Sequence, residues 1–488
     1  MAYAPTMVAK DHEAHPLVPL PRHVEWHDGI CALPSDVAVV ADQPDAAAVA
    51  AMFVMDLATQ SGIRPHLAAE PRGIDVTLQL HAHRADLGTE GYELFAAADG
   101  LGLVAATPHG LWNATRTALQ LIHVDGTLPA AHILDMPRFE WRGAMLDVAR
   151  HPFTAGDVCR FVDLIARHKL NRLHLHLTDD QGWRLEIPDW PALTLVGGST
   201  ATGGDAGGWF TLSDWAHIVA YASDRFVSIV PEVDMPGHTN AALASVPNLN
   251  PDGVAPPLYT GKEVGFSSLR LDLPLTRRFV SDVVATLAAV TPGEYLHIGG
   301  DEAHSTDPDA YVEFITFLQM EVERHGKSMV GWEEITAAPL NRHSLVQHWL
   351  RPETAAKAPR ACRIIMSPAR HTYLDMQHAE GDPIGRRWAG AIDLPTIHDW
   401  DPATQIPDVD DHRIAGVEAP LWTEKVRTFE QVQTLCFPRL VCLAEVGWTA
   451  QALRDWSTFR DRLAVAADAL AADGVPVYQS SLLAAPTD

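Results

Sequence analysis

The feature of this sequence that most constrains its fold is a structural unit that repeats after Trp141. From there onward, short apolar segments each end in polar or aromatic residues, and most are followed by a helical or loop segment before the next one. Such segments are typical of strands that alternate with helices. The candidate strands begin near Ala144, Leu173, Val227, Tyr295, Ser328, Leu345, Ile364 and Ile414.

Eight strands of this kind predict an α/β fold, a (β/α)8 barrel of the TIM type. Helical periodicity over residues 157–168 and 308–324 supports the alternation. The alternative, an open doubly wound sheet, is less consistent with the sequence because a glycine-rich phosphate loop is lacking. In a barrel, reactive side chains lie at the carboxyl ends of the strands, where the loops converge.

The part of the chain before the barrel has a different pattern and predicts a smaller α+β domain. Apolar runs at residues 37–40 and 74–80 are typical of strands, and residues 46–61 carry apolar side chains at helical spacing. Pro137 ends regular structure, so we place a linker there. The expected domains are therefore residues 1–137 and residues 138–488.

Charge and cysteine content exclude several classes of protein. The chain carries 36 Lys and Arg against 62 Asp and Glu, and its net charge of −26 would repel nucleic acids and anionic membranes. Five cysteines without CxxC spacing predict neither a disulfide framework nor a zinc knot. Residues 1–17 lack an apolar stretch long enough for an export signal. We therefore expect a cytoplasmic enzyme without a metal, a cofactor, a nucleic acid partner or a membrane partner.

Acidic residues follow two of the predicted strands. Residues 172–177 alternate strictly between polar and apolar and then run into Asp179 and Asp180. We expect Asp179 to face the barrel mouth, because Asp180 is better suited to a turn or a helix cap. The segment Pro231-Glu232-Val233-Asp234-Met235-Pro236-Gly237-His238 again joins a buried strand to acids, and His238 is a candidate partner for a carboxylate.

The sharpest signal is the segment Tyr295-Leu296-His297-Ile298-Gly299-Gly300-Asp301-Glu302. Two glycines allow another group to approach the backbone closely, just where two adjacent carboxylates emerge. Adjacent side chains on an extended chain point in different directions, so Asp301 and Glu302 suit different tasks. We expect mutual repulsion and partial burial to keep one of them protonated near neutral pH.

Aromatic residues recur at the ends of other predicted strands. A single tryptophan usually belongs to a core, but several tryptophans at strand ends beside carboxylates are typical of a sugar site. There, aromatic faces contact C–H surfaces and acids bind hydroxyl groups. The residues concerned are Trp332, Trp349, Tyr373, Asp375, Trp422 and Glu424.

Taken together, these segments resemble family 20 of the glycoside hydrolases, the β-N-acetylhexosaminidases, from about Val18 to Tyr478. The resemblance implies a small non-catalytic domain before a catalytic barrel. It also implies a small carbohydrate substrate with a terminal N-acetylglucosamine or N-acetylgalactosamine. The segments that carry it are Leu146-Asp147-Val148-Ala149-Arg150-His151, His174-Leu175-His176-Leu177-Thr178-Asp179-Asp180-Gln181-Gly182-Trp183, Pro231-Glu232-Val233-Asp234-Met235-Pro236-Gly237-His238 and Gly299-Gly300-Asp301-Glu302.

The resemblance further implies retaining, substrate-assisted hydrolysis. Glu302 would protonate the glycosidic oxygen and then activate water. Asp301 would orient the acetamido group of the substrate, whose oxygen attacks the anomeric carbon to give an oxazolinium intermediate. Aromatic residues would surround the acetamido group, and charged residues would bind hydroxyls. The implied substrate-binding residues are Arg150, Trp332, Trp349, Tyr373, Asp375, Trp422 and Glu424, and Asp179 and His238 would form a supporting network.

Three alternatives stay open at this point. His174 and His176 with Asp179 could bind zinc as in a metal-dependent amidohydrolase, but the pair lies within its strand rather than at the mouth. A carbohydrate-binding protein without turnover would keep the pocket, and the intact Asp301 and Glu302 argue against it. A sulfated or oligomeric hexosaminide would depend on outer loops, and the negative net charge gives no support to a sulfated one.

Overall fold

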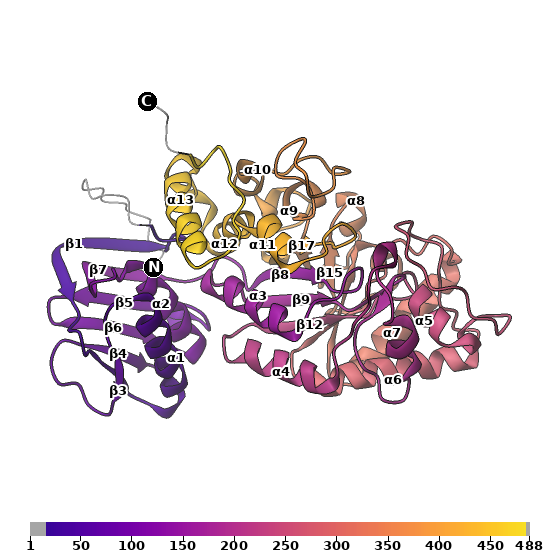
Figure 1. Ribbon diagram of the computed structural model, residues 1–488, viewed down its shortest axis with the longest axis horizontal. Coiled ribbons are helices and arrows are strands. Elements are labelled where there is room, and N and C mark those ends of the chain that lie inside the picture. Colours follow the sequence, from indigo (N-terminus) through magenta and orange to yellow (C-terminus); the bar gives the residue numbers. More distant parts are fainter. Residues whose placement is uncertain (1–15, 485–488) are drawn as a thin grey trace.

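The computed structural model describes residues 16–484 as two packed parts, an N-terminal sheet and a closed barrel (Figure 1). Residues 1–15, on which most of the expectation about an export signal rests, lie outside this described range. Among residues 16–484, no helix has both the length and the apolar composition that crossing a membrane requires.

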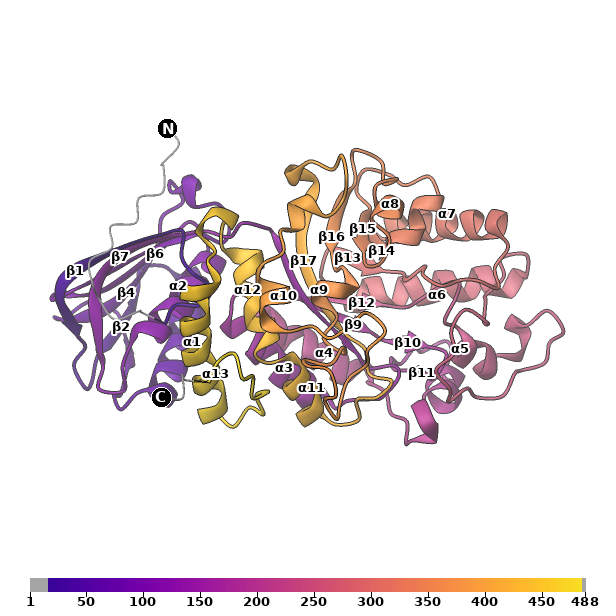
Figure 2. The ribbon, with the colours of Figure 1, turned by 90° about the horizontal axis from the view of Figure 1, so that it is seen from above.

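The N-terminal part is a mixed seven-stranded sheet with two helices packed on one face (Figure 2). Its elements are β1 (His23–Ala32), β2 (Ala38–Ala41), α1 (Pro44–Gln60), β3 (His66–Ala68), β4 (Asp75–Leu80), β5 (Tyr92–Ala97), β6 (Gly100–Ala105), α2 (Pro108–Leu121) and β7 (Thr127–Asp135). The strand order is β1-β7-β5-β6-β4-β2-β3. A smaller N-terminal domain is confirmed, and β2, α1 and β4 match the predicted strands and helix.

The remainder contains a closed barrel of eight parallel strands, as predicted. The strands are β8 (Trp141–Asp147), β9 (Arg172–His176), β12 (Ser228–Glu232), β13 (Tyr295–His297), β14 (Ser328–Trp332), β15 (Leu345–His348), β16 (Arg363–Met366) and β17 (Ile414–Leu421). Each corresponds to one predicted strand. The first differs most, since β8 begins at Trp141 and Ala144 lies inside it.

Helices cover the outside of the barrel, and a short hairpin of β10 (Thr178–Asp179) and β11 (Gly182–Trp183) lies beyond the carboxyl end of β9. At α3, a capping box between Thr154 and Asp157 fixes the first turn. The helices are α3 (Ala155–Arg167), α4 (Leu212–Ser223), α5 (Asn240–Ser245), α6 (Pro274–Val290), α7 (Pro308–Arg324), α8 (Pro352–Ala355), α9 (Ala369–Thr372), α10 (Leu394–His398), α11 (Phe429–Cys436), α12 (Arg439–Trp448) and α13 (Trp456–Ala472).

Buried charged groups join the N-terminal sheet to the barrel. Lys169, just before β9, donates to Tyr92 Oη at 2.8 Å and lies 3.2 Å from Asp135 Oδ2. Arg142 at the start of β8 forms an ion pair with Glu90. Because these barrel residues lie at the amino ends of their strands, the N-terminal domain packs against the end of the barrel opposite the mouth.

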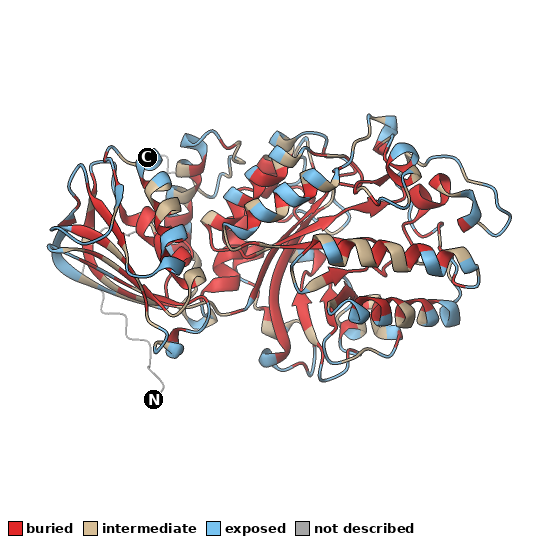
Figure 3. Ribbon diagram, turned by 90° about the horizontal axis from the view of Figure 1, so that it is seen from below, coloured by how far each residue is buried: buried red, intermediate tan, exposed pale blue. Residues whose placement is uncertain are grey.

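The interior of the barrel is filled in layers, and its strands are buried along most of their length (Figure 3). Above an apolar layer, register places His176, Glu232 and His297 side by side on three neighbouring strands. A polar layer thus separates the apolar layer from the mouth. The apolar layer consists of Trp141, Val230, Val330, Leu345, Ile365 and Ala415.

Candidate active site

A pocket opens at the carboxyl ends of the barrel strands, as expected for this fold. Eight of the predicted catalytic and substrate-binding residues line it. Trp332 lies beneath them, with its ring centroid 5.8 Å from that of Trp422. The lining residues are Arg150, Lys262, Val264, Asp301, Glu302, Trp349, Leu350, Tyr373, Asp375, Arg386, Trp388, Trp422 and Glu424.

The turn after β13 aims the two adjacent carboxylates. Gly299 has a φ of 67°, and a Cβ there would lie 1.8 Å from Asp234 Oδ1. Only glycine therefore allows Asp234 to approach this backbone, where its Oδ1 accepts from the Gly300 N–H at 2.9 Å. Glu302 itself has a φ of 46°, an unusual conformation for a side-chain-bearing residue. The turn brings both carboxylates close to His238 Nε2, with Asp301 Oδ2 at 3.7 Å and Glu302 Oε2 at 3.5 Å.

Asp234, to which the sequence assigned no role, forms a buried acidic pair with Asp301. Atoms of Asp234, His238 and Asp301 all lie within 4.8 Å of one another. Burial and the Asp301 carboxylate raise the pKa of Asp234 well above its usual value. Burial and the neighbouring Glu302 also raise the pKa of Asp301, so the expected rise falls on Asp301 of the adjacent pair and extends to Asp234.

Glu302 lies beside His238, which Asp179 holds from behind. Glu302 Oε2 is 3.5 Å from His238 Nε2, and His238 Nδ1 is 3.2 Å from Asp179 Oδ1. Burial disfavours the charged ring, but Asp179 raises the pKa of His238 well above its usual value. Burial alone would raise the pKa of Glu302, but the neighbouring His238 lowers it. Arg150 reaches the same Asp179 carboxylate at 2.7 Å, so the predicted supporting residues do meet.

Aromatic rings form one wall of the pocket. The rings of Trp349 and Tyr373 lie nearly parallel, with centroids 6.3 Å apart, and Tyr373 also lies 6.3 Å from Trp422. Trp349 Nε1 donates to Glu334, which fixes the indole. Trp388 meets Trp349 and Tyr373 edge-on and leaves 47% of its surface exposed at the rim. Such a wall suits the C–H faces of a sugar ring.

Carboxylate oxygens in the pocket are buried without donors. Within the described part of the chain, Asp375 has no hydrogen-bond partner at either side-chain oxygen, and Asp301 Oδ1 and Glu424 Oε2 have none either. Burial and the neighbouring Glu424 raise the pKa of Asp375 well above its usual value. Arg386 forms an ion pair with the other oxygen of Glu424. Buried oxygens of this kind suit donors supplied by a ligand.

Comparisons with known proteins agree with this geometry. A model of the glycosyl hydrolase family 20 catalytic domain matches residues 139–313 and 304–451, and a model of domain 2 of the same family matches residues 14–136. The chain belongs to glycoside hydrolase family 20. It is a glycosidase with a TIM barrel, and its function is that of a β-N-acetylhexosaminidase.

Relatives in family 20 match almost the whole chain. A β-N-acetylhexosaminidase of Cellulomonas fimi is 39% identical over 92% of this chain and 92% of its own length. The N-acetyl-β-hexosaminidase of Streptomyces plicatus, solved in complex with Thio-NAglucal, is 41% identical over 96% of this chain and 97% of its own, with a TM-score of 0.93. A family 20 enzyme of Streptomyces coelicolor A3(2) has a TM-score of 0.92 at 40% identity, covering 97% and 99% of the two chains.

The histidine pair that could have bound zinc is engaged with carboxylates in this family 20 barrel. His174 faces Glu418 at 2.8 Å and Glu232 at 3.0 Å, and His176 faces Glu232 at 2.5 Å and Asp179 at 2.9 Å. Burial opposes protonation, but the carboxylates raise the pKa of His174 to about 9 and that of His176 to about 10. As imidazolium ions they would donate to these carboxylates from both nitrogens.

Sequence reasoning missed residues that hold the family 20 site in place. Asp147 Oδ1 accepts from the Arg150 N–H at 3.0 Å, and its Oδ2 accepts from the Thr423 N–H at 3.0 Å. It thereby fixes Arg150 and the loop that carries Trp422. Asp147, Glu232 and Asp234 lie within the motif segments quoted above. Their acidic side chains at or near the ends of predicted strands were the signal that could have marked them as site residues. No such signal marked Arg386 or Trp388, which lie in an irregular loop between α9 and α10.

Proposed function

We propose that this enzyme is a retaining exo-β-N-acetylhexosaminidase that removes terminal, non-reducing N-acetylglucosamine or N-acetylgalactosamine by substrate-assisted catalysis. The observation that carries the proposal is the position of Asp301. Its Oδ1 is buried and has no hydrogen-bond partner among the described residues. Asp301 lines the pocket with the aromatic wall, next to Glu302, the candidate general acid. An acetamido N–H is a donor that would satisfy this oxygen.

The acetamido group would act as the nucleophile. Asp301 would accept its N–H, which orients the carbonyl oxygen toward the anomeric carbon, and Tyr373 would donate to that oxygen. The oxazolinium that forms carries positive charge, which the Asp301 carboxylate stabilises in a site with little water. This mechanism is the one known for family 20 and is carried over with the family, because carboxylate spacing alone does not distinguish it.

Proton transfer would fall to Glu302. It would protonate the departing glycosidic oxygen and then, as a carboxylate, remove a proton from the water that opens the oxazolinium. His238 favours the carboxylate form of Glu302, which matches the second of these steps. A proton on Asp234, whose pKa burial and Asp301 raise, would let Asp234 donate to Asp301 and keep the negative charge on Asp301.

Hydroxyl groups of the terminal sugar would meet the charged residues of the pocket. Asp375 and Glu424 offer buried acceptor oxygens, and Arg150 and Arg386 line the same pocket as donors. Charge-assisted hydrogen bonds of this kind are stronger than neutral ones and depend on hydroxyl geometry. The relative from Streptomyces plicatus was solved with N-acetylglucosamine bound as a product in two variants, which supports a ligand of this class.

The deciding experiment compares an aryl β-N-acetylglucosaminide with the matching aryl β-glucoside, each with and without a thiazoline mimic of the oxazoline. Cleavage of the acetamido sugar alone, blocked by the mimic, is the expected result. An aryl β-N-acetylgalactosaminide tests the second sugar, and NMR of the first-formed product tests retention. Equal cleavage of both glycosides would contradict the roles given to Asp301 and the aromatic pocket.

A further inference from the structure

Glu232, at the end of β12, lies fully buried at the centre of the polar layer inside the barrel. Its Oε1 accepts from the Trp332 indole N–H at 2.9 Å. Its Oε2 faces His176 Nδ1 at 2.5 Å and His174 Nε2 at 3.0 Å. The positive rings lower the pKa of Glu232 well below its usual value despite its burial, so it is a permanent carboxylate. Its Oε1 also lies 3.0 Å from His297 Nδ1, so one side chain contacts four others.

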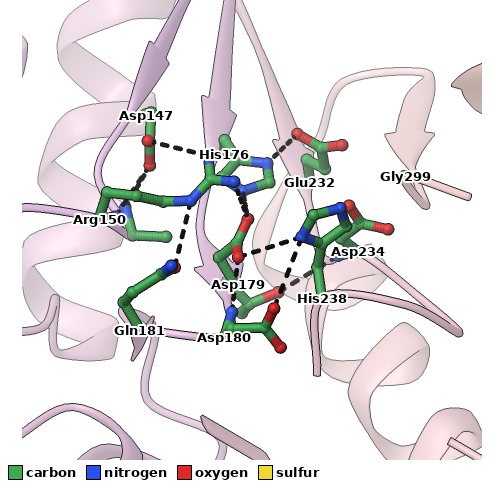
Figure 4. Close-up of polar contacts among 12 residues, drawn as sticks. Asp147, Arg150, His176, Asp179, Asp180, Gln181, Glu232, Asp234, His238 and Gly299 are labelled. Carbon is green, nitrogen blue, oxygen red and sulfur yellow. Dashed lines mark hydrogen bonds and ion pairs between the residues drawn. The ribbon is translucent and has the colours of Figure 1, made fainter. Parts of the chain in front are cut away.

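At least two of these four contacts lead toward the pocket. One leads to Trp332, whose indole lies beneath Trp422. The other leads to His176, whose second nitrogen faces Asp179 Oδ2 at 2.9 Å, and Asp179 in turn holds Arg150 and His238 (Figure 4). His238 lies 3.5 Å from Glu302.

We propose that Glu232 is a positioning residue for the hydrolysis. From inside the barrel its carboxylate sets the orientation of the Trp332 indole on one side and of the His176–Asp179–His238 series on the other. The inference rests on the proposed function, because Trp332 is taken there as part of the acetamido pocket and Glu302 as the acid and base. Glu232 itself lies outside the pocket lining.

The chemistry of the contacts explains why a carboxylate is needed at this position. Glu232 must accept from an uncharged indole and from two buried imidazolium rings at once, and a carboxylate offers acceptors on both oxygens. Charge-assisted hydrogen bonds are shorter and more directional than neutral ones, so each partner has a fixed ring orientation. A displacement of about 1 Å in a catalytic group can lower a rate about 10²-fold, so orientation of this kind has kinetic consequences.

Glu418 provides a matched control within the same layer. It is also fully buried and ionised, and its carboxylate accepts from His174 at 2.8 Å, from Trp141 at 2.9 Å and from Gln347 at 2.9 Å. Among the described residues, none of these three donors lines the pocket. Glu232→Gln and Glu418→Gln therefore each remove one buried carboxylate charge from this layer, but Glu418 reaches the two routes only indirectly, through His174 and Glu232.

The first test measures kcat/KM of both variants on an aryl β-N-acetylglucosaminide, with folding checked by circular dichroism and thermal unfolding. Glu232→Gln should lose about 10²-fold, while Glu418→Gln should stay within a few-fold of the wild type. Equal losses in the two variants, or a Glu232→Gln enzyme close to wild type, would overturn the proposal.

The second test asks whether the effect passes through the two named routes. The affinity for the thiazoline mimic is measured in a cycle of Glu232→Gln with Trp332→Phe, which removes the indole N–H. The pH profile of kcat/KM is measured in a cycle of Glu232→Gln with Asp179→Asn. Losses in each double variant should be smaller than the product of the single losses. Strict multiplication in both cycles would contradict the inference.

Glu232→Asp keeps the charge but shortens the side chain by one methylene, so it also serves if Glu232→Gln does not fold. We expect a folded enzyme with reduced kcat/KM, because the shorter carboxylate cannot reach both the indole and His176. Wild-type activity in this variant would show that charge alone matters and would overturn the proposal. Failure of the proposed function is recognised separately, since the wild-type enzyme would then lack selectivity for the acetamido sugar.

Discussion

The mouth and the interior of this barrel use the same residue types in opposite ways. In the interior, the carboxylates of Glu232 and Glu418 accept hydrogen bonds from neighbouring side chains, among them positively charged histidine rings. At the mouth, Asp301 and Asp375 have buried oxygens that the described residues leave without a donor. A buried polar atom without a partner costs about 1–3 kcal/mol. The interior thus fixes geometry, and the mouth retains hydrogen-bonding capacity for a substrate.

The largest effect at the mouth should come from Glu302→Gln, because the variant cannot supply a proton. For an alkyl or other poor leaving group, kcat/KM should fall about 10²- to 10⁴-fold. Activated nitrophenyl glycosides need the proton less and should lose less. A plot of rate against leaving-group pKa over a substrate series measures this difference, and a uniform loss across the series would count against Glu302 as the acid.

Asp301→Asn should have the next largest effect, since it removes the charge that stabilises the oxazolinium. We expect kcat to fall about 10²- to 10³-fold, as for the loss of one preorganised electrostatic contact. The midpoint of thermal unfolding should stay near that of the wild type, because the interior contacts are untouched. Turnover close to the wild-type value would remove Asp301 from this role.

Asp375→Ala tests a mouth residue that would bind only a hydroxyl. Leaving a buried hydroxyl of the substrate without its partner costs about 1–3 kcal/mol, so kcat/KM should fall about 5- to 150-fold. Asp375→Asn keeps one acceptor oxygen and should lose less. For a substrate that lacks the contacted hydroxyl, kcat/KM should be the same in the Asp375→Ala variant and the wild type. A lower kcat/KM of the variant on that substrate would contradict direct binding.

His238→Asn tests the junction between the interior series and the mouth. His238 lowers the pKa of Glu302, so removing the positive ring should raise that pKa. The protonated form of Glu302 then persists to higher pH, so the alkaline limb of the pH profile of kcat/KM should shift to higher pH. An unchanged limb would mean that another group controls it.

The smallest effect concerns the pH dependence of stability in the interior. The folded-state pKa values of about 9 for His174 and about 10 for His176 lie above the unfolded value of 6.5. Their contribution to stability is therefore complete below pH 6.5 and is lost as the pH rises through 9 and 10. Urea unfolding between those limits should show a falling free energy of unfolding. A His176→Gln variant should show a shallower fall, and an identical slope would contradict the assignment.

The barrel strands and the carboxylates at their ends could be predicted because their signals are local. Alternation along residues 172–177 and the pair Asp301-Glu302 are visible in the sequence without any neighbour. The raised pKa of Asp234 could not be predicted, because it depends on how closely Gly299 lets that side chain approach Asp301. Arg386 and Trp388 were missed for a different reason, since their loop has no periodicity that would indicate its path.

The buried ion pairs between the N-terminal sheet and the barrel have a consequence for how the chain can be divided. Asp135 joins Lys169 and the indole of Trp448, and Arg462 of α13 donates to the carbonyl of Leu17 near the other end of the chain. A barrel expressed from residue 138 would keep Lys169 and Arg142 but lose the acids that neutralise them. The linker thus separates two parts of different sequence pattern that are not independent folding units. Limited proteolysis at the linker should release fragments that do not refold separately.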